Sequence, residues 1–252
     1  MRTISAVDLD EKENLHVARY VFLREITRDI PKAKELEQEY KVKIYGYFSD
    51  DELIALESTL ARFPDRFMEG MTFILIPLDS AILSGDLLDP YTEKGDVVTA
   101  FYLGARAKGK DYAPGSVTIL HNNIKKYSGS TSRSFMIDQQ SNLYTHEMGH
   151  RVQDVVMIES GVDPEDTFTT YPEGSFLSDW IKVWVEKRDD PNGPLTLYGS
   201  TLAHEGLAEF SVAYFKNYEV VINAPRFKDF VDVFQKHGVY PRGIEEKNNI
   251  PN

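Results

Sequence analysis

The feature that most constrains the fold is a pair of histidines four residues apart, His146 and His150, with Glu147 directly after the first. On an α-helix this spacing places both imidazoles on one face, one turn apart. Two neutral imidazoles so placed can share one metal ion, and Glu147 can take a proton from a metal-bound water. The pattern His-Glu-x-x-His is the helical zinc site of many metalloproteases. It supplies two ligands and a base, whereas a catalytic zinc normally has three protein ligands.

The third ligand can be supplied in three ways. A metzincin site needs a glycine and a histidine three and six residues after His150, where this chain has Gln153 and Val156, so that class is excluded. Asp154 lies one turn after His150. At that offset on the same helix a side chain tends to run past the metal, so we expect Asp154 to support the site or the helix. The third way is a glutamate from a later helix, as in thermolysin-type sites.

A later segment, residues 201–218, has a helical pattern and carries Glu205 and Glu209 on one face. Two carboxylates on a partly apolar helix are costly unless positive charge meets them, and zinc with two imidazoles would provide it. One glutamate can bind the metal while the other accepts a ring N–H from a ligating histidine. The alternative is a solvated acidic face. His204 is a rival ligand, but helix neighbours differ in direction by about 100°, which favours a surface or supporting role.

Length, charge and cysteine content narrow the class of protein. The 252 residues fit one sizeable domain or two packed lobes. Because the chain has no cysteine, any zinc must be held by histidine and carboxylate. The net charge of −12 argues against nucleic acid or an anionic membrane as the partner. No stretch has the length of a membrane span, and the acidic N-terminal segment is not a signal peptide.

Apolar periodicity predicts a mixed first half and a helical second half. We expect helices at 8–30, 34–40, 50–62, 135–158, 175–187, 201–218 and 223–237, and strands at 42–48, 71–77, 97–106 and 116–121. Ser49 begins a capping box before the third of these helices. The fold class is therefore α+β, predominantly helical with a small mixed β-sheet. With the His-Glu-x-x-His motif, the expected fold is that of a zincin-type metalloprotease. We expect a single catalytic domain, residues 1–252, made of an N-terminal lobe (1–134), the active-site helix (135–159) and an all-α C-terminal lobe (160–252).

Several side chains outside the motif have a structural interpretation. Trp180 and Trp184, four apart, are expected to pack in the core. His121 is expected to be structural or to line the cleft. Tyr102 lies on the strand that we expect to border the cleft, where an extended peptide could add to the sheet edge; the alternative is that the sheet is only core.

The chain resembles the catalytic domain of anthrax lethal factor and the clostridial Pro-Pro endopeptidases, one group of gluzincin-type zinc endopeptidases. The resemblance rests on the residues 146–150, on Tyr198 seven positions before Glu205, on the pattern Glu-x-x-Ala-Glu-Phe at 205–210, and on Asn-Ala-Pro at 223–225. The matching motifs cover about residues 135–235. The chain departs from the group in the long insert at 160–195.

The resemblance implies a function for each matching residue. Glu205 would be the third zinc ligand, after His146 and His150. Tyr198 would stabilise the transition state, and Glu209 would support the ligands. The resemblance also implies a secreted, toxin-like protein, and we expect a monomer.

Together these features predict a metalloendopeptidase that binds Zn²⁺ and hydrolyses an extended peptide or protein substrate. Glu147 would act as the base, with Tyr198 as a hydrogen-bond donor to the oxyanion. The alternative is a non-catalytic binding or toxin domain of the same fold with a structural zinc. A structural site usually has four protein ligands, whereas these motifs offer three together with a base and a tyrosine, which favours the enzyme. Substrate sequence is not predicted.

Overall fold

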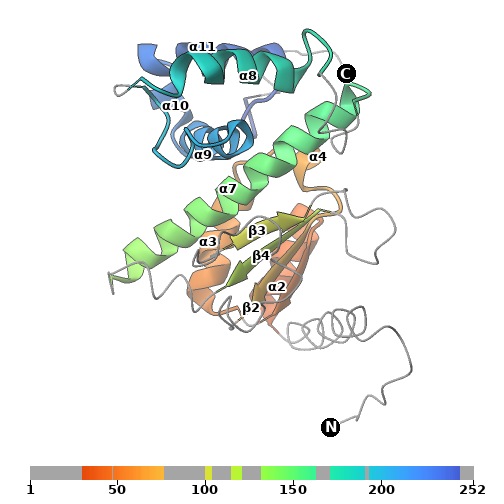
Figure 1. Cartoon of the computed structure of the whole chain (residues 1–252). Helices are drawn as coiled ribbons and strands as arrows, with labels where there is room; N and C mark the ends of the chain where they lie inside the picture. Colours follow the sequence, from red (N-terminus) through yellow and green to blue (C-terminus); the bar gives the residue numbers. More distant parts are fainter. Residues whose placement is uncertain are drawn as a thin grey trace, which may run out of the picture.

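The computed structural model describes residues 30–46, 48–76, 100–103, 115–120, 132–162, 171–190 and 193–244. The helices are α2 (Pro31–Tyr40), α3 (Asp50–Leu60), α4 (Asp65–Met68), α7 (Arg133–Glu159), α8 (Phe176–Lys187), α9 (Ala203–Lys216), α10 (Tyr218–Val221) and α11 (Lys228–Lys236), with a 3₁₀ turn, η1, at Pro225–Phe227. The strands are β1 (Lys43–Gly46), β2 (Thr72–Ile76), β3 (Ala100–Leu103) and β4 (Ser116–Leu120). This arrangement confirms the predicted α+β class (Figure 1).

The four strands form one small sheet in the order β1-β2-β4-β3. The first three of these are parallel, and β3 runs antiparallel to β4 at the edge of the sheet. The predicted mixed sheet is therefore confirmed, and Thr72–Ile76 of the apolar run 71–77 forms an inner strand. Phe73 and Leu75 of β2 are buried, as expected for a strand that is paired on both sides and covered by helices. Among the described residues, β1 and β3 are therefore the two edge strands of the sheet.

Helix α7 passes between the sheet and the later helices (Figure 1). On one side it contacts α3, α4, β3 and β4; on the other side it contacts α8 and α9. Because it is covered on both sides, many of its side chains are buried, including Tyr144, Met148 and Val152. Tyr144 meets Phe73 of the sheet edge-to-face, with ring centroids 6.0 Å apart. A helix that is buried on two faces gives its polar side chains a low-dielectric environment, which matters for the motif that it carries.

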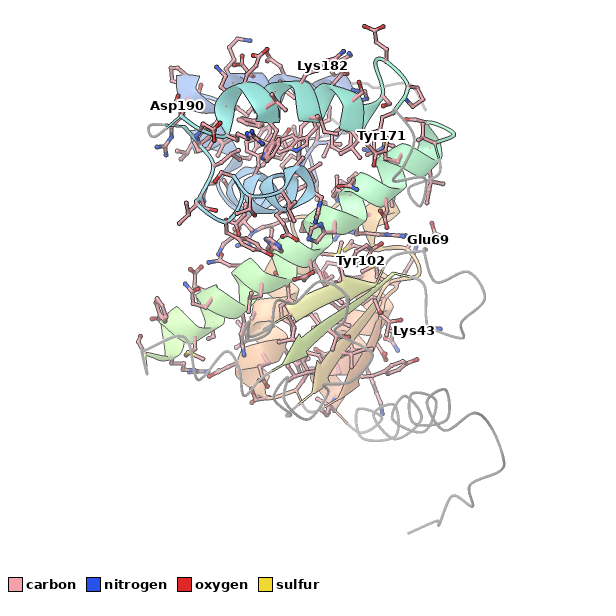
Figure 2. The ribbon with its side chains drawn as sticks, viewed as in Figure 1. Lys43, Glu69, Tyr102, Tyr171, Lys182 and Asp190 are labelled. Atoms are coloured by element: carbon pink, nitrogen blue, oxygen red, sulfur yellow. The ribbon has the colours of Figure 1, made fainter. Side chains whose placement is uncertain are left out.

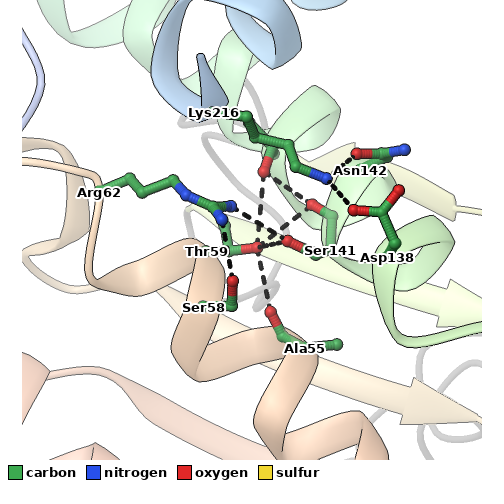
Figure 3. A network of polar contacts seen from close by, with 9 residues as sticks. Ala55, Ser58, Thr59, Arg62, Asp138, Ser141, Asn142 and Lys216 are labelled. Carbon is green, nitrogen blue, oxygen red and sulfur yellow. Dashed lines mark hydrogen bonds and ion pairs between the residues drawn. The ribbon is translucent and has the colours of Figure 1, made fainter. Parts of the chain in front are cut away.

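Polar side chains fix α7 against its neighbours (Figure 3). The hydroxyl of Thr59 on α3 is 3.2 Å from the hydroxyl of Ser141 on α7, and Arg62 donates to the same hydroxyl at 3.2 Å. On the opposite side, Lys216 at the end of α9 donates to Asp138 at 2.6 Å and also to Asn142. Both contacts lie on α7 before the histidine motif. They therefore join α3 and α9 to the same stretch of the central helix.

An aromatic core holds the C-terminal helices together. Trp180 of α8 packs on Phe230 of α11 with ring centroids 4.7 Å apart, and Phe210 of α9 meets Phe234 at 4.9 Å. Trp180 is fully buried, which confirms the core position predicted for it. In residues 171–190 and 193–244 the regular elements are all helical, as expected for this lobe. None of the helices in the described part of the chain has both the length and the apolar character needed to cross a bilayer.

Most predicted elements are observed with small shifts at their ends. The capping box of Ser49 forms, since Ser49 accepts from the Glu52 N–H and Glu52 accepts from the Ser49 N–H at 2.6 Å. Two short helices, α4 and α10, were not predicted, and the helix expected at 201–218 begins at Ala203. The predicted helix at 8–30 and His121 lie outside the described residues.

Candidate metal centre

Helices α7 and α9 bring three predicted ligands together. Ligand atoms of His146, His150 and Glu205 all lie within 4.8 Å of one another. The Oε2 atom of Glu205 is 3.1 Å from Nε2 of His146 and 3.8 Å from Nε2 of His150. All three side chains are mostly buried, with exposed fractions of 11%, 18% and 15%. The two histidines share one helical face, as the spacing predicted, and the carboxylate reaches them from a second helix.

These distances are suitable for a zinc ion. In a tetrahedral site with metal–ligand bonds of about 2.0–2.2 Å, neighbouring ligand atoms lie roughly 3.4 Å apart. The observed separations of 3.1 Å and 3.8 Å fall on either side of that value. Two imidazoles and one carboxylate are also a usual donor set for zinc, and they leave a fourth position open. The residues present therefore fit the predicted metal, and His146, His150 and Glu205 are the ones that would hold it.

A close approach of the two helices makes this geometry possible. A Cβ atom added to Gly149 would lie 2.8 Å from the Cα of Ala208 and 3.0 Å from Cβ of Ser211. Real Cβ atoms do not approach backbone atoms so closely. The helices α7 and α9 can therefore be in contact at Gly149 only because glycine has no side chain. Since Gly149 lies between the two metal-site histidines, this contact sets how far Glu205 stands from them.

Glu209 contacts the opposite side of the His146 ring. Its Oε1 atom lies 3.3 Å from Nδ1 of His146, while Nε2 of the same ring faces Glu205. The second oxygen of Glu209 accepts a hydrogen bond from the Thr196 hydroxyl at 3.2 Å. The two glutamates thus separate into the functions that the sequence suggested, one toward the metal position and one toward the ring N–H. A solvated acidic face is excluded by these contacts.

Charge within the site is concentrated on a few buried groups. Burial opposes a positive charge on His146, but its hydrogen bonds to Glu205 and Glu209 outweigh burial and raise its pKa to about 10. Burial likewise opposes charge on Glu205, yet its contacts with His146 and His204 hold its pKa below the usual range. His146 and Glu205 therefore stabilise each other's charge, and hydrogen bonds hold both side chains in place.

Glu147 is a buried carboxylate with a raised pKa. Burial is the largest cause, and the nearby charge of Glu205 adds to it, so the pKa of Glu147 is about 7. The positive charge of His146 and a hydrogen bond from the backbone N–H of Tyr102 act in the opposite direction. A carboxyl group with a pKa near neutrality can both accept and release a proton at physiological pH.

Tyr198 lies at the open side of the site. Its ring centroid is 6.1 Å from that of His146, and 55% of the residue is exposed. Burial of the hydroxyl, the charge of Glu205 and a hydrogen bond with Glu205 together raise its pKa above the usual value. The hydroxyl therefore keeps its proton at neutral pH and lies against Glu205, while much of the residue is exposed.

Tyr102 and Asp154 form a further contact beneath the histidines. Tyr102, on the edge strand β3, lies between the sheet and α7 (Figure 2). Its hydroxyl donates to Asp154 Oδ2 at 3.1 Å, and its ring is stacked on His150 with centroids 6.5 Å apart. Asp154 is almost fully buried, so it does not form an ion pair at the surface. Its position fits the supporting role that the sequence indicated.

His204 lies beside the ligand group without belonging to it. Its Nε2 atom is 3.3 Å from Oε1 of Glu205, the oxygen that faces away from His146, and its side chain is 46% exposed. Among the described residues, the group whose atoms could surround one metal ion contains His146, His150 and Glu205, and not His204. A partly exposed, supporting His204 is what the helix geometry predicted.

Comparisons of the chain with protein-family models, with curated proteins and with solved structures found no match. What can be said of function therefore rests on the residues and their arrangement.

Three features of the site were missed from the sequence. They are the hydrogen bond of Thr196 to Glu209, the contact of Gly149 with α9, and the bonds of Trp180 and Trp184 to backbone carbonyls. All of them join different structural elements, so they depend on how the elements pack. A weak signal was present in two of them. Gly149 stands inside a buried helical pattern, where glycine usually marks close packing, and buried tryptophans usually find an acceptor for their N–H.

Proposed function

We propose that this chain is a zinc-dependent endopeptidase of zincin-type architecture, similar to the lethal factor group of gluzincins. The proposal rests on the convergence of His146, His150 and Glu205 from two separate helices on one small volume. A buried carboxyl, Glu147, and a tyrosine hydroxyl, Tyr198, border the same volume. Three ligands with a base and a hydrogen-bond donor are what metal-assisted hydrolysis of an amide requires.

Each side chain has a defined task in this proposal. His146, His150 and Glu205 would hold a zinc ion, which would act as a Lewis acid and lower the pKa of a coordinated water to about 7. Glu147 accepts the proton of the attacking water and passes it to the departing amine, because its buried carboxyl borders the three proposed ligands. Tyr198 donates a hydrogen bond to the oxygen on which negative charge develops. Glu209 holds the His146 ring in the orientation that leaves Nε2 facing the ligand position.

The edge strand β3 supports a peptide as the substrate. In the described part of the chain its outer edge pairs with no other strand, and its Tyr102 N–H donates to Glu147. An extended peptide that paired with β3 would therefore have its backbone beside the proposed base. Such pairing requires an unfolded or flexible segment, so we propose that the substrate is an extended peptide or a loop of a protein.

Cleavage of a peptide library, before and after treatment with a zinc chelator, tests the proposal. We expect internal cleavage that the chelator abolishes and added zinc restores, with the fold retained in the absence of metal. The Glu147→Gln variant is the matched control, because it keeps all three proposed ligands. If the chelator unfolds the chain and no peptide is cleaved at any stage, the zinc is structural and the alternative of a non-catalytic domain holds.

A further inference from the structure

The segment that carries Tyr198 is a turn with little burial of its own. We call residues 196–202 the tyrosine turn. Leu197 and Leu202 are 89% and 52% exposed, so the turn is not fixed by apolar side chains in the core. Its internal hydrogen bonds, such as that from the Ser200 N–H to the Thr196 carbonyl at 3.0 Å, set its shape. They do not set its position relative to the metal centre, so other contacts must do so.

One of these contacts is the hydrogen bond from the Thr196 hydroxyl to Glu209 of α9. The others come from α8, the helix within the 160–195 insert. The indole N–H of Trp184 donates to the Gly199 carbonyl at 2.9 Å, and that of Trp180 donates to the Ala203 carbonyl at 2.7 Å. Gly199 follows Tyr198 directly, and Ala203 begins α9. One tryptophan therefore holds the turn, and the other holds the start of the helix that carries Glu205.

Close packing makes the Trp184 contact specific. A Cβ atom added to Gly206 would lie 2.6 Å from the Gly199 carbonyl oxygen and 2.8 Å from Cδ1 of Trp184. The turn, α9 and the indole thus meet where only glycine fits. Trp184 is 6% exposed, so water does not replace its N–H as the partner of the carbonyl. Losing this donor would leave a buried carbonyl unsatisfied, which the turn can relieve only by moving.

We propose that Trp184 is a positioning residue for Tyr198. Its hydrogen bond to Gly199 fixes the tyrosine turn so that the Tyr198 hydroxyl faces Glu205 and the ligand group. The 160–195 insert then has a function at the site, because α8 supports the side from which Tyr198 acts. This inference rests on the proposed function, and it adds to that function a residue that touches neither the metal position nor the substrate.

The variant Trp184→Phe tests the inference, since it keeps an aromatic ring and removes the donor. We expect full zinc content, an unchanged KM and a kcat lowered about 10- to 100-fold, because a small displacement of a catalytic group costs about that much. The matched control is Tyr214→Phe, which removes another buried donor to a backbone carbonyl, that of Val239 at 2.9 Å, away from the site. Its kcat should stay at the level of the unmodified protein.

A double variant separates positioning from general damage. If Trp184 acts through Tyr198, then Trp184→Phe should lower kcat little further once Tyr198→Phe is present. The inference would be overturned if the fold-reductions in kcat of the two single variants multiply in the double variant. A lowered zinc content in Trp184→Phe would also overturn it. If Trp184→Phe does not fold, an analogue of tryptophan with sulfur in place of the indole N–H keeps the shape and repeats the test.

A measurement that does not depend on cleavage completes the design. With 3-fluorotyrosine in place of Tyr198, Co²⁺ in the metal centre should shift the fluorine resonance, and Trp184→Phe should change that shift while Tyr214→Phe leaves it unaltered. If the unmodified protein binds Co²⁺ but cleaves no peptide, the proposed function fails, and the fluorine shift alone decides the positioning. The same fluorine shift in the unmodified protein, in Trp184→Phe and in Tyr214→Phe would refute the positioning role of Trp184. Failure of the unmodified protein to bind Co²⁺ would refute it as well.

Discussion

Glu209 contacts His146 through the ring nitrogen that faces away from Glu205, with Oε1 of Glu209 3.3 Å from Nδ1. The other oxygen of Glu209 accepts from Thr196 in the tyrosine turn. One carboxylate therefore joins a proposed metal ligand to the segment that carries Tyr198. The orientation of the imidazole and the position of the turn depend on the same side chain.

Replacing Glu209 by alanine should weaken metal binding without removing it. The three proposed ligands stay, but the His146 ring loses its partner at Nδ1, and the loss of such a partner typically lowers metal affinity about 10- to 100-fold. Competition with a chromophoric chelator measures the change. Glu219→Ala, on the exposed helix α10, is the control and should bind zinc as the unmodified protein does.

Replacing Glu205 by alanine should remove the metal from the site. Glu205 supplies the carboxylate that faces both histidines, and the described residues offer no other group within reach of both. Metal analysis after dialysis should find little zinc in Glu205→Ala and full occupancy in His204→Ala. Full occupancy in Glu205→Ala would move the third ligand to His204 or Asp154.

The Glu147→Gln variant should keep its zinc and lose peptide cleavage. The amide has nearly the shape of the carboxyl group but cannot take a proton from water. General acid–base groups contribute roughly 100- to 10,000-fold, so kcat should fall by at least the lower figure. Zinc content and turnover are measured on the same preparation. Cleavage at the rate of the unmodified protein would show that another group is the base.

Stability of the chelator-treated protein should depend on pH through Glu147. Its folded-state pKa of about 7 lies above the ordinary value of 4.5, so its stabilising contribution is complete below pH 4.5 and is lost as the pH rises through about 7. At about 1.4 kcal/mol for each pKa unit, the loss is of the order of 3 kcal/mol. The raised pKa of His146 acts in the same direction only above its ordinary value of 6.5.

Urea unfolding across this pH range measures the effect. Between pH 4.5 and 6.5 the unmodified protein should lose stability, whereas Glu147→Gln, which does not titrate, should not show this part of the loss. An equal loss in the variant would assign the pH dependence to other groups.

Replacing Gly149 by alanine should separate α7 from α9. The added methyl group would meet the Ala208 backbone at 2.8 Å, and the helices must move to admit it. Overpacking of this kind costs about 1–3 kcal/mol, and the displacement of Glu205 should also weaken zinc binding. Ile158→Ala, at an exposed position of the same helix, should change stability by no more than about 0.5 kcal/mol. Unaltered zinc affinity in Gly149→Ala would contradict this explanation.

The parts of the site that follow a local rule were accessible from the sequence. The spacing of His146 and His150 fixes their common face on any helix, and the capping box of Ser49 depends only on residues three apart. Glu205 and Glu209 also share a face by spacing alone. Which of them faces the metal position was accessible only through the resemblance, because it depends on how α9 lies against α7.

The remaining parts depend on contacts that no local pattern encodes. Residues 196–202 form a turn, and α9 begins only at Ala203. From another helix, Trp184 donates to the Gly199 carbonyl within the turn, and Trp180 donates to the carbonyl of Ala203. Tyr102 meets Asp154 across 52 positions of sequence. Helices α4 and α10 are single turns, too short to show a period. In each case the tertiary environment decides the local structure.

The contact of Gly149 with the Ala208 backbone alters what the motif means in this chain. His-Glu-x-x-His is written with two free positions, yet here the first is Met148, fully buried, and the second admits no Cβ atom. A search for other proteins built on this helix pair should therefore specify all five residues, as His-Glu-apolar-Gly-His. Chains that match only the shorter pattern would have to cross their two helices at a wider spacing.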